Sequence, residues 1–464
     1  MESKKLNRRD FLKMLGAGAA AASLAACVAA PAPGGAPAQP AESGESASSA
    51  ETGSGAAAPS PDKVQMSIAT FQDPLHDWQR EFAKRWAEQN PDTVDLSIEE
   101  VVYAEMNKLQ LARSASGTLW DLVFSGIKWF PYSASKGMFL ALDDHLATRD
   151  DAKLDDFFPT ALAGGYLDGV LFGLPYEIHP GNPALVVLNT DMLAEKGLTM
   201  PTDDWNVFEY ADLAEQMTDL DNNIYGTNYL PGNYYDFESL VRAYGSDMMD
   251  EERKQFLFNT DEKNIEAAQW IVDLRLKRNA APMRDETQGL QFVAGTLATQ
   301  VTGSYSVNGF ATEIGDKFNH DWVLFPKGPD GKRAYTAFTS NFSVSSGTVD
   351  PDKAVDLLVF LSSTEAGTWS ALEQGTGQPN ARRSVWENED LLNKSHPIFR
   401  RVLDMYNDAS IPGPFPMPFN LRFQELQDNW ANTSPDVFYG DLGFEEGMQA
   451  VQDACQEILD LPRA

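Results

Sequence analysis

The sequence predicts an α/β fold with more than one lobe, and three observations lead to this prediction. Strand-like and helix-like segments alternate along the chain from residue 66 onward. Residues 66–124 follow the order strand, helix, strand, helix, strand, which implies parallel strands with helices on both faces of a sheet. Residues 62–464 are also too many for one ordinary domain, and their number suggests two.

The first five elements are predicted by hydrophobic periodicity. They are strands at 66–71, 94–98 and 120–124 and helices at 76–90 and 103–115. In the first helix Trp78, Phe82 and Trp86 recur at intervals of four residues, and Asn90-Pro91 ends the pattern. Asp168-Gly169 then separates two short apolar runs, which indicates a hairpin.

A second series of strands and helices follows the hairpin. Its strands are expected at 184–188, 297–302 and 322–325, and its helices at 190–196, 202–218, 264–277 and 350–361. In the helix at 202–218 we expect Phe208, Ala211 and Leu213 to face the core. The last helix has proline at its first position, Pro351, where its missing N–H is harmless.

The N-terminus has the features of a bacterial export signal. A basic region with Arg8-Arg9 precedes an apolar stretch, residues 14–26, which is about half the length needed to span a bilayer. The twin arginines favour the twin-arginine route. Leu24-Ala25-Ala26-Cys27 resembles the bacterial lipoprotein box, which implies that residues 1–26 are removed and that Cys27 is lipidated.

Residues 27–61 are predicted to be a lipidated cysteine followed by a disordered tether. The stretch after Cys27 is almost entirely Ala, Pro, Gly, Ser and Glu, so it cannot bury enough apolar surface to fold. Without residues 1–26, which hold five basic and two acidic side chains, the formal charge falls from −32 to −35. Such an acidic chain would be repelled by phosphate backbones, which argues against nucleic-acid binding.

Only one other cysteine, Cys455, is present, so a disulfide within the lipidated chain is excluded. Met448, Val451, Cys455 and Ile458 recur at helical spacing. We therefore expect Cys455 to be a buried small hydrophobic residue and not a nucleophile.

Seven short segments, in order along residues 62–430, resemble a known family. They are IATF (68–71), KL with ASG and WDLV (108–123), DGVLFGLPY (168–176), LNTDML with GL (188–198), PT with WNVF (201–208), FVAGTLA with GSY (292–305) and FPKGP (325–329). The chain is similar to the extracellular solute-binding proteins of ABC importers, the family that includes sugar- and maltose-binding proteins. It departs from the family pattern at Tyr305, where tryptophan is usual, at Thr296, where lysine is usual, and at Trp120, where proline is common.

The resemblance implies a two-lobed periplasmic-binding-protein type II fold, with crossing hinge strands and a ligand cleft between the lobes. Lobe 1 would comprise residues 62–175 and about 340–384, and lobe 2 residues 176–339 and about 385–464. It implies a non-enzymatic, monomeric lipoprotein without cofactor or metal, held on the outer face of the cell membrane, extracellular or periplasmic, through Cys27. Its partners would be a carbohydrate, a mono- or oligosaccharide, and the transmembrane subunits of an ABC permease.

Candidate ligand-binding residues follow from the rule that ligands lie beyond the carboxyl ends of strands, and from the expected hinge. They are Phe71, Gln72, Asp73, Ser125, Trp129, Tyr176, Glu177, Tyr234, Ser304, Tyr305, Asn341, Gln378 and Arg382. Aromatic rings would cover the apolar faces of a sugar, and polar side chains would bind its hydroxyls. Core packing is the alternative for the aromatic candidates, and plain surface charge is the alternative for Asp73, Glu177 and Arg382.

Other functions stay open at this point. An exported hydrolase acting on glycans lacks a supporting motif, since no Gly-x-Ser-x-Gly elbow occurs and no two histidines stand at metal-ligand spacing, although a pair of catalytic carboxylates could still form. With the same fold, the ligand could be a glycerol phosphodiester, or ferric iron held by Tyr234-Tyr235. The sequence names neither the solute nor the fold role of about 386–435.

Overall fold

The computed structural model describes residues 63–180, 183–372, 380–408 and 412–464, which belong to one compact unit, Pro59–Ala464. The predicted signal segment, Cys27, the tether and Gln378 lie outside the described residues. Within the described ranges, no helix combines the length and the apolar character that a bilayer crossing requires.

A six-stranded sheet contains the first predicted elements. Its strands are β1 (Val64–Phe71), β2 (Val94–Val101), β3 (Leu122–Gly126), β6 (Leu174–Pro180), β10 (Tyr335–Val344) and β11 (Pro412–Pro414). The order is β11-β10-β3-β1-β2, with β6 paired to β10. β1 pairs in parallel with both β2 and β3, so the predicted parallel arrangement is confirmed. The third strand was expected at 120–124 and begins later, at Leu122.

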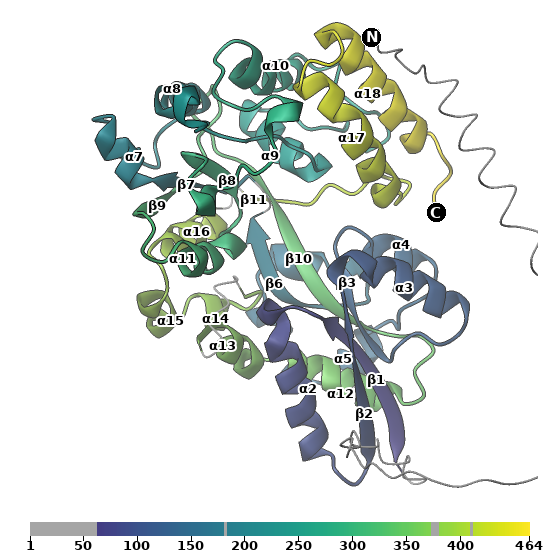
Figure 1. The fold of residues 1–464 in the computed structure, drawn as a ribbon. Helices are drawn as coiled ribbons and strands as arrows, with labels where there is room; N and C mark the ends of the chain where they lie inside the picture. The colour runs from purple at the N-terminus through teal and green to yellow at the C-terminus, as the bar shows by residue number, and fades with distance from the viewer. Residues whose placement is uncertain (1–62, 181–182, 373–379, 409–411) are drawn as a thin grey trace, which may run out of the picture. The chain divides into compact units, whose positions relative to one another are not determined.

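Helices cover both faces of this sheet, as right-handed crossovers require. They are α2 (Asp77–Gln89), α3 (Tyr103–Ala115) and α12 (Pro351–Leu361). Figure 1 shows α2 and α3 on opposite sides of β1 and β3. Trp86 of α2 donates its indole N–H to Asp356 of α12 at 3.0 Å, which ties these two helices together. Asp350 caps the backbone N–H of Lys353, so the predicted start of α12 is confirmed.

Strands β6 and β10 form an antiparallel pair, and each leads along the chain to or from a second, three-stranded sheet. That sheet has the order β8-β7-β9, from β7 (Leu185–Asn189), β8 (Thr299–Thr302) and β9 (His320–Leu324). All of its pairs are antiparallel. In Figure 1 the long strand β10 runs from the neighbourhood of β7 and β8 to β3. The hairpin predicted at Asp168-Gly169 is confirmed as β4 (Tyr166–Leu167) and β5 (Val170–Leu171).

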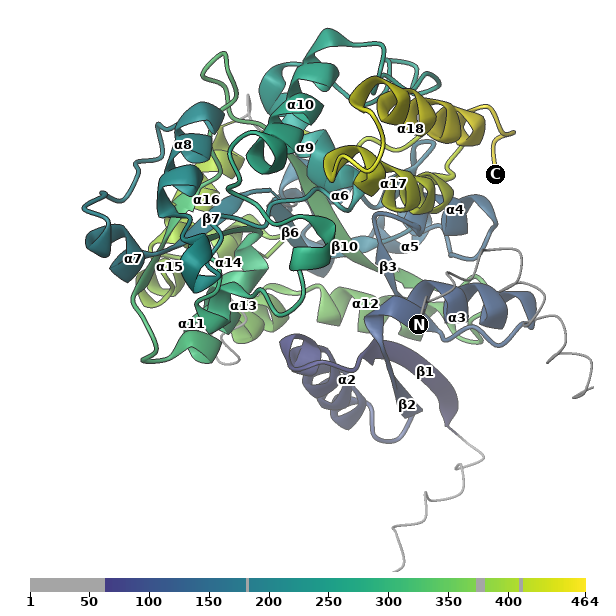
Figure 2. The ribbon, with the colours of Figure 1, turned by 45° about the horizontal axis from the view of Figure 1, so that its top comes forward.

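Long helices pack around the second sheet. They are α8 (Val207–Met217), α9 (Tyr234–Tyr244), α10 (Glu262–Leu276), α17 (Phe423–Phe438) and α18 (Phe444–Leu459), and α17 and α18 lie side by side (Figure 2). The expected inward orientation of Phe208 is wrong, because Phe208 is 51% exposed. The buried face of α8 instead contains Val207, Tyr210 and Ala211.

The remaining segments are short. They are α4 (Phe130–Ser135), α5 (Asp143–Leu146), α6 (Pro159–Ala163), α7 (Thr190–Glu195), α11 (Val307–Ile314), α13 (Thr364–Leu372), α14 (Arg383–Trp386), α15 (Glu389–Lys394) and α16 (Ile398–Asn407). The segment 386–435, whose role the sequence left open, contributes α15, α16 and β11 and most of α17. Arg401 of α16 donates to the carbonyl of Trp322 in β9 at 2.7 Å, so this helix is bound to the second sheet.

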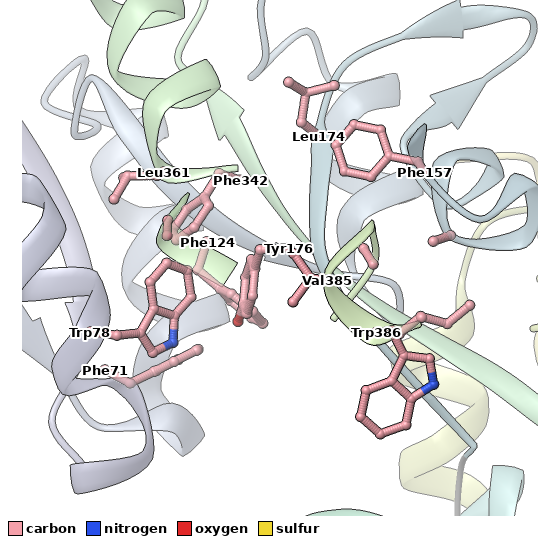
Figure 3. Packing of buried hydrophobic residues seen from close by; sticks show 14 of the residues in the cluster. Phe71, Trp78, Phe124, Phe157, Leu174, Tyr176, Phe342, Leu361, Val385 and Trp386 are labelled. Carbon is pink, nitrogen blue, oxygen red and sulfur yellow. The ribbon is translucent and has the colours of Figure 1, made fainter. Parts of the chain in front are cut away.

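The buried hydrophobic residues form two clusters. One surrounds the six-stranded sheet and extends to α14–α16, and Figure 3 shows part of it, with Phe71, Trp78 and Tyr176 close together. The other lies among α8, α9, α10, α17 and α18, with Trp430 at 0% exposure against Phe237, whose ring centroid is 5.2 Å away.

Cys455 is a member of the second cluster and is fully buried, as predicted. Burial raises the pKa of its thiol to about 12, so very little thiolate forms near neutral pH. In a Cys27→Ser variant, we expect less than about a tenth of the thiol to react with a disulfide reagent at pH 8 within minutes. Denatured protein should react fully in the same assay. Fast labelling of the native protein would contradict this burial.

Candidate ligand-binding site

A cavity of about 400 Å³ lies where the ends of β1 and β3, the β6–β10 pair and the start of α9 meet. It is lined by Phe71, Asp73, Leu75, His76, Tyr103, Phe124, Gly126, Ile127, Lys128, Tyr176, Glu177, Asn233, Tyr235, Asp236, Tyr305, Phe338, Thr339 and Ser340. Its position beyond the carboxyl ends of parallel strands is the one expected for ligands in open α/β sheets.

Aromatic rings make up much of the cavity wall. On one side Phe71 meets Phe124 edge-on, with 4.4 Å between ring centroids. On the other side Tyr235 meets Phe338 edge-on at 4.7 Å. Tyr176 also lines the cavity, and its ring centroid lies 4.8 Å from that of Phe342, so it packs in the core as well (Figure 3).

Tyr305 follows β8 in the short 3₁₀ turn Ser304–Ser306 and is 36% exposed within the cavity wall. Its ring lies against the backbone of Gly303, where a Cβ atom would collide with the ring. Glycine at this position therefore permits the ring orientation. The arrangement leaves much of the tyrosine available for contact with a ligand.

Glu177 and Ser340 face each other across the β6–β10 pair. The register of the pair shifts between Ser340 and Asn341, and such an irregularity redirects side chains. The Ser340 hydroxyl donates to Glu177 Oε1 at 2.5 Å, while the buried Oε2 has no hydrogen-bond partner. Glu177 is only 6% exposed, so the cavity presents an acceptor that water reaches poorly.

Asp236 stands in the first turn of α9 and is 3% exposed. Asn233 donates to its Oδ2 at 3.0 Å, and its Oδ1 has no partner. Burial raises the pKa of Asp236 to about 7, although the Asn233 hydrogen bonds and the charge of Lys128 act in the opposite direction. A donor on a ligand would satisfy the vacant acceptor.

This elevated pKa makes stability depend on pH. In the unfolded chain Asp236 releases its proton near 3.8, whereas the folded protein holds the proton until about pH 7. Ionisation of Asp236 therefore lowers the free energy of unfolding as the pH rises from 3.8 to about 7. The whole of this loss applies above about pH 7. We expect the ligand-free Asp236→Asn variant to be more stable than wild type at pH 8, by at least about 1 kcal/mol. Urea unfolding should show little difference near pH 4, and equal gains at both pH values would contradict this.

Asp73 and Lys128 are the other charged groups of the cavity, with His76 beside Asp73. Burial alone would raise the pKa of Asp73, but the hydrogen bond with His76 at 2.7 Å and the charge of His76 lower it below its usual value. Lys128 lies with its Nζ 5.4 Å from the ring centre of Tyr103 and 5.2 Å from that of Tyr235. These are cation–π distances, so the lysine links aromatic residues of α3 and α9.

Five of the candidates predicted from the sequence line this cavity: Phe71, Asp73, Tyr176, Glu177 and Tyr305. Gln378 lies outside the described residues. The other seven do not line the cavity: Gln72, Ser125, Trp129, Tyr234, Ser304, Asn341 and Arg382.

Most of these seven have structural partners. The hydroxyls of Ser125 and Ser343 are hydrogen-bonded at 2.7 Å, and Asn341 donates to the carbonyl of Gly164 at 2.9 Å. Trp129 packs edge-on against Phe124 behind the wall, at 5.5 Å. Gln72 is exposed at the end of β1, and Ser304 is buried at 1% exposure.

Arg382 is not a surface charge, since it is 1% exposed, and it does not line the cavity. Its guanidinium donates to the carbonyls of Ser362 at 2.5 Å, Ala152 at 2.9 Å and Lys153 at 3.1 Å. These bonds join three segments that are distant in sequence, so its role is structural.

The adjacent tyrosines expected for the iron hypothesis point into different surroundings. Tyr234 is fully buried in the second cluster, and burial raises the pKa of its hydroxyl well above the usual value. Tyr235 lines the cavity. The pair therefore does not present two phenolates to one ion. Among the described residues, no group of three His, Cys, Asp or Glu side chains is arranged to hold a metal.

Sequence reasoning missed several cavity residues, above all Tyr103, Lys128, Asn233, Tyr235, Asp236 and Phe338. The sequence does contain a pattern that could have identified the cavity residues of α9. Tyr234, Phe237, Val241 and Tyr244 recur at helical spacing and all are buried, which places Tyr234 on the core face. Tyr235 and Asp236 then fall on the other side, toward the cavity.

Comparison with known proteins agrees with this architecture. The family model described as bacterial extracellular solute-binding protein matches residues 69–368, and that of the twin-arginine translocation pathway signal sequence matches residues 5–25. Among solved structures, the ABC substrate-binding protein Lmo0181 from Listeria monocytogenes, solved with cycloalternan, has a TM-score of 0.75 at 19% identity, over 86% of this chain and 99% of that one.

The GacH receptor of Streptomyces glaucescens, solved unliganded and with acarbose, has a TM-score of 0.72 at 20% identity, over 86% and 99% of the two chains. The cyclic α-maltosyl-1,6-maltose binding protein from Arthrobacter globiformis has a TM-score of 0.70 at 19% identity, again over 86% and 99%. At these identities the likeness establishes the fold, which is the expected two-lobed α/β type.

Proposed function

Because this chain belongs to the bacterial extracellular solute-binding protein family, we propose that it captures a carbohydrate in the cavity described above and passes it on to the transmembrane subunits of an ABC importer. One observation carries the choice of a carbohydrate: the cavity combines exposed aromatic ring faces with buried acceptors that lack partners. The solved structures of similar fold include proteins in complex with cycloalternan and acarbose, which supports the same choice.

The chemistry of a sugar matches these features. A pyranose ring has apolar C–H faces, which pack well on aromatic rings such as those of Tyr235 and Tyr305. Its hydroxyls donate hydrogen bonds, and Glu177 Oε2 and Asp236 Oδ1 are buried oxygens that need a donor. A glycerol phosphodiester fits less well, because three carboxylates line the cavity and its only lysine is Lys128.

Binding would be coupled to a movement of two lobes about the strands that connect them. We assign residues 62–175 and about 340–384 to lobe 1, and residues 176–339 and about 385–464 to lobe 2. Phe71 and Asp73 would then belong to lobe 1, and Tyr235 and Tyr305 to lobe 2. A solute that contacts both sets stabilises the closed arrangement and shifts a pre-existing equilibrium toward it.

The match of residues 5–25 to the twin-arginine signal sequence supports binding outside the cytoplasm. We further propose that Cys27 carries a lipid and that residues 28–61 act as a flexible tether to the membrane. A coil of this length spans roughly 30–35 Å on average. Such a tether raises the local concentration of the binding protein at its permease.

Thermal-shift screening of the purified protein against mono- and oligosaccharides, glycerol phosphodiesters and Fe³⁺ tests the proposal. Stabilisation by one or a few saccharides, recovered unaltered by chromatography, is the expected result. Stabilisation by the phosphodiester or by iron alone would contradict carbohydrate binding. Release of a shortened saccharide would show instead that the protein is a hydrolase.

A further inference from the structure

The charges in the cavity are unbalanced. Three carboxylates line it, those of Asp73, Glu177 and Asp236, and Lys128 is the only lysine or arginine among its lining residues. His76 also lines the cavity, but its Nδ1 is already bonded to Asp73 at 2.7 Å. A neutral guest would leave this excess of negative charge in place.

Two of the carboxylates are buried and incompletely bonded. Glu177 is 6% exposed and Asp236 is 3% exposed. Neither Glu177 Oε2 nor Asp236 Oδ1 has a hydrogen-bond partner, and both residues line the cavity. Burying an ionised carboxylate without a partner costs free energy, because the charge loses its hydration. A bound cation with N–H donors lowers this cost most, since it supplies both opposite charge and hydrogen bonds.

Within the described part of the chain, Lys128 does not act as a cationic partner in contact with Glu177 or Asp236. Among the described residues the Lys128 Nζ forms no ion pair within 4 Å, and it lies over the rings of Tyr103 and Tyr235 at 5.4 and 5.2 Å. Asn233 donates to the other oxygen of Asp236, and Ser340 donates to the other oxygen of Glu177. Both donors are neutral, and the charge of Lys128 acts on Asp236 only from a distance, so neither carboxylate is in direct contact with a cation.

We propose that the solute is an amino sugar, or an oligosaccharide of amino sugars, whose protonated amine binds at Asp236 and Glu177 while its ring packs on the aromatic wall. This inference rests on the proposed carbohydrate function and narrows it. An ammonium group has three hydrogen-bond donors and a full positive charge, whereas a hydroxyl has one donor and no charge. Acidic sugars such as uronates are disfavoured, because their carboxylate would face three others. The net charge of −35 on the chain without residues 1–26 also favours the approach of cationic solutes.

Calorimetric titration with matched saccharides tests this inference. The series contains glucosamine and galactosamine, their N-acetylated and 2-hydroxy counterparts and the corresponding uronates, each as monosaccharide and, where obtainable, as short oligomers. At pH 7 and low salt, where a sugar amine is mostly protonated, the best amine form should bind wild type at least tenfold more tightly than its N-acetylated and hydroxyl counterparts. Uronates should bind weakest.

The Asp236→Asn variant should reduce this preference to threefold or less. Asp95→Asn, which removes an exposed carboxylate of β2, is the control and should leave the preference unchanged. Equal or tighter binding of the neutral sugars to wild type would overturn the inference and leave the carbohydrate function standing. Failure of every saccharide to bind would overturn both. If Asp236→Asn does not fold, the wild-type series alone decides.

Discussion

Replacing Tyr305 with alanine is expected to weaken saccharide binding by about 5- to 70-fold. The tyrosine is 36% exposed in the cavity wall, so its ring is available to pack on a sugar face. Covering the exposed third of the side chain contributes about 0.5–1 kcal/mol, and the interaction of the ring itself adds about 0.5–1.5 kcal/mol. Calorimetric titration with the saccharide that gives the largest thermal shift measures the loss.

Tyr166→Ala is a matched control for this variant, since Tyr166 is 38% exposed but lies on β4, outside the cavity. Its affinity for the saccharide should equal that of wild type within about twofold. A Gly303→Ala variant should also lose affinity, because a Cβ atom there would push the Tyr305 ring out of place. Unchanged affinity in Tyr305→Ala would show that the ligand does not use this wall.

The largest loss of stability is expected for Arg382→Ala. The guanidinium is buried, stacks over Phe157 at 4.0 Å from the ring centre and donates to three backbone carbonyls. Removing it leaves those carbonyls without their donor, and each unsatisfied buried group costs about 1–3 kcal/mol. We therefore expect a destabilisation of about 3–5 kcal/mol in urea unfolding.

The neighbouring Arg383→Ala variant provides the comparison, because the Arg383 side chain is 41% exposed and its ion pair with Glu387 is long, at 3.6 Å. It should change stability by less than about 1 kcal/mol. If the Arg382→Ala variant still folds at low temperature, its affinity for the saccharide should equal that of wild type. Loss of affinity without loss of stability would instead place Arg382 at the ligand.

Much of the fold was predictable because the local patterns and the topology rules agree. The spacing of Trp78, Phe82 and Trp86 identified α2, and the order of elements implied the parallel β1–β2 and β1–β3 pairs. Phe208 shows the limit of such patterns. The face with Val207, Tyr210 and Ala211 has as good a helical spacing as the face with Phe208. Only the packing of α8 against its neighbours decides which of these two faces is buried.

The cavity was predictable at the strand ends and the hinge, and on the opposite side only at Tyr305, which follows β8. Strand ends and the hinge located Phe71, Asp73, Tyr176 and Glu177, since the rule for parallel sheets places ligands there. The wall from α9 follows from how that helix is rotated. The adjacent tyrosines alone do not reveal this rotation, whereas the helical spacing of Tyr234, Phe237, Val241 and Tyr244 does. Arg382 was misassigned for a related reason: whether an arginine meets solvent, ligand or carbonyl oxygens depends on contacts between segments far apart in sequence.

A crystal structure of the protein with its tightest-binding saccharide would show whether the cavity binds an intact sugar. We expect one intact saccharide in the cavity, with a ring face on Tyr305 or Tyr235 and polar contacts to Glu177 and Asp236. A saccharide bound at another place, or one cleaved in the cavity, would contradict this expectation.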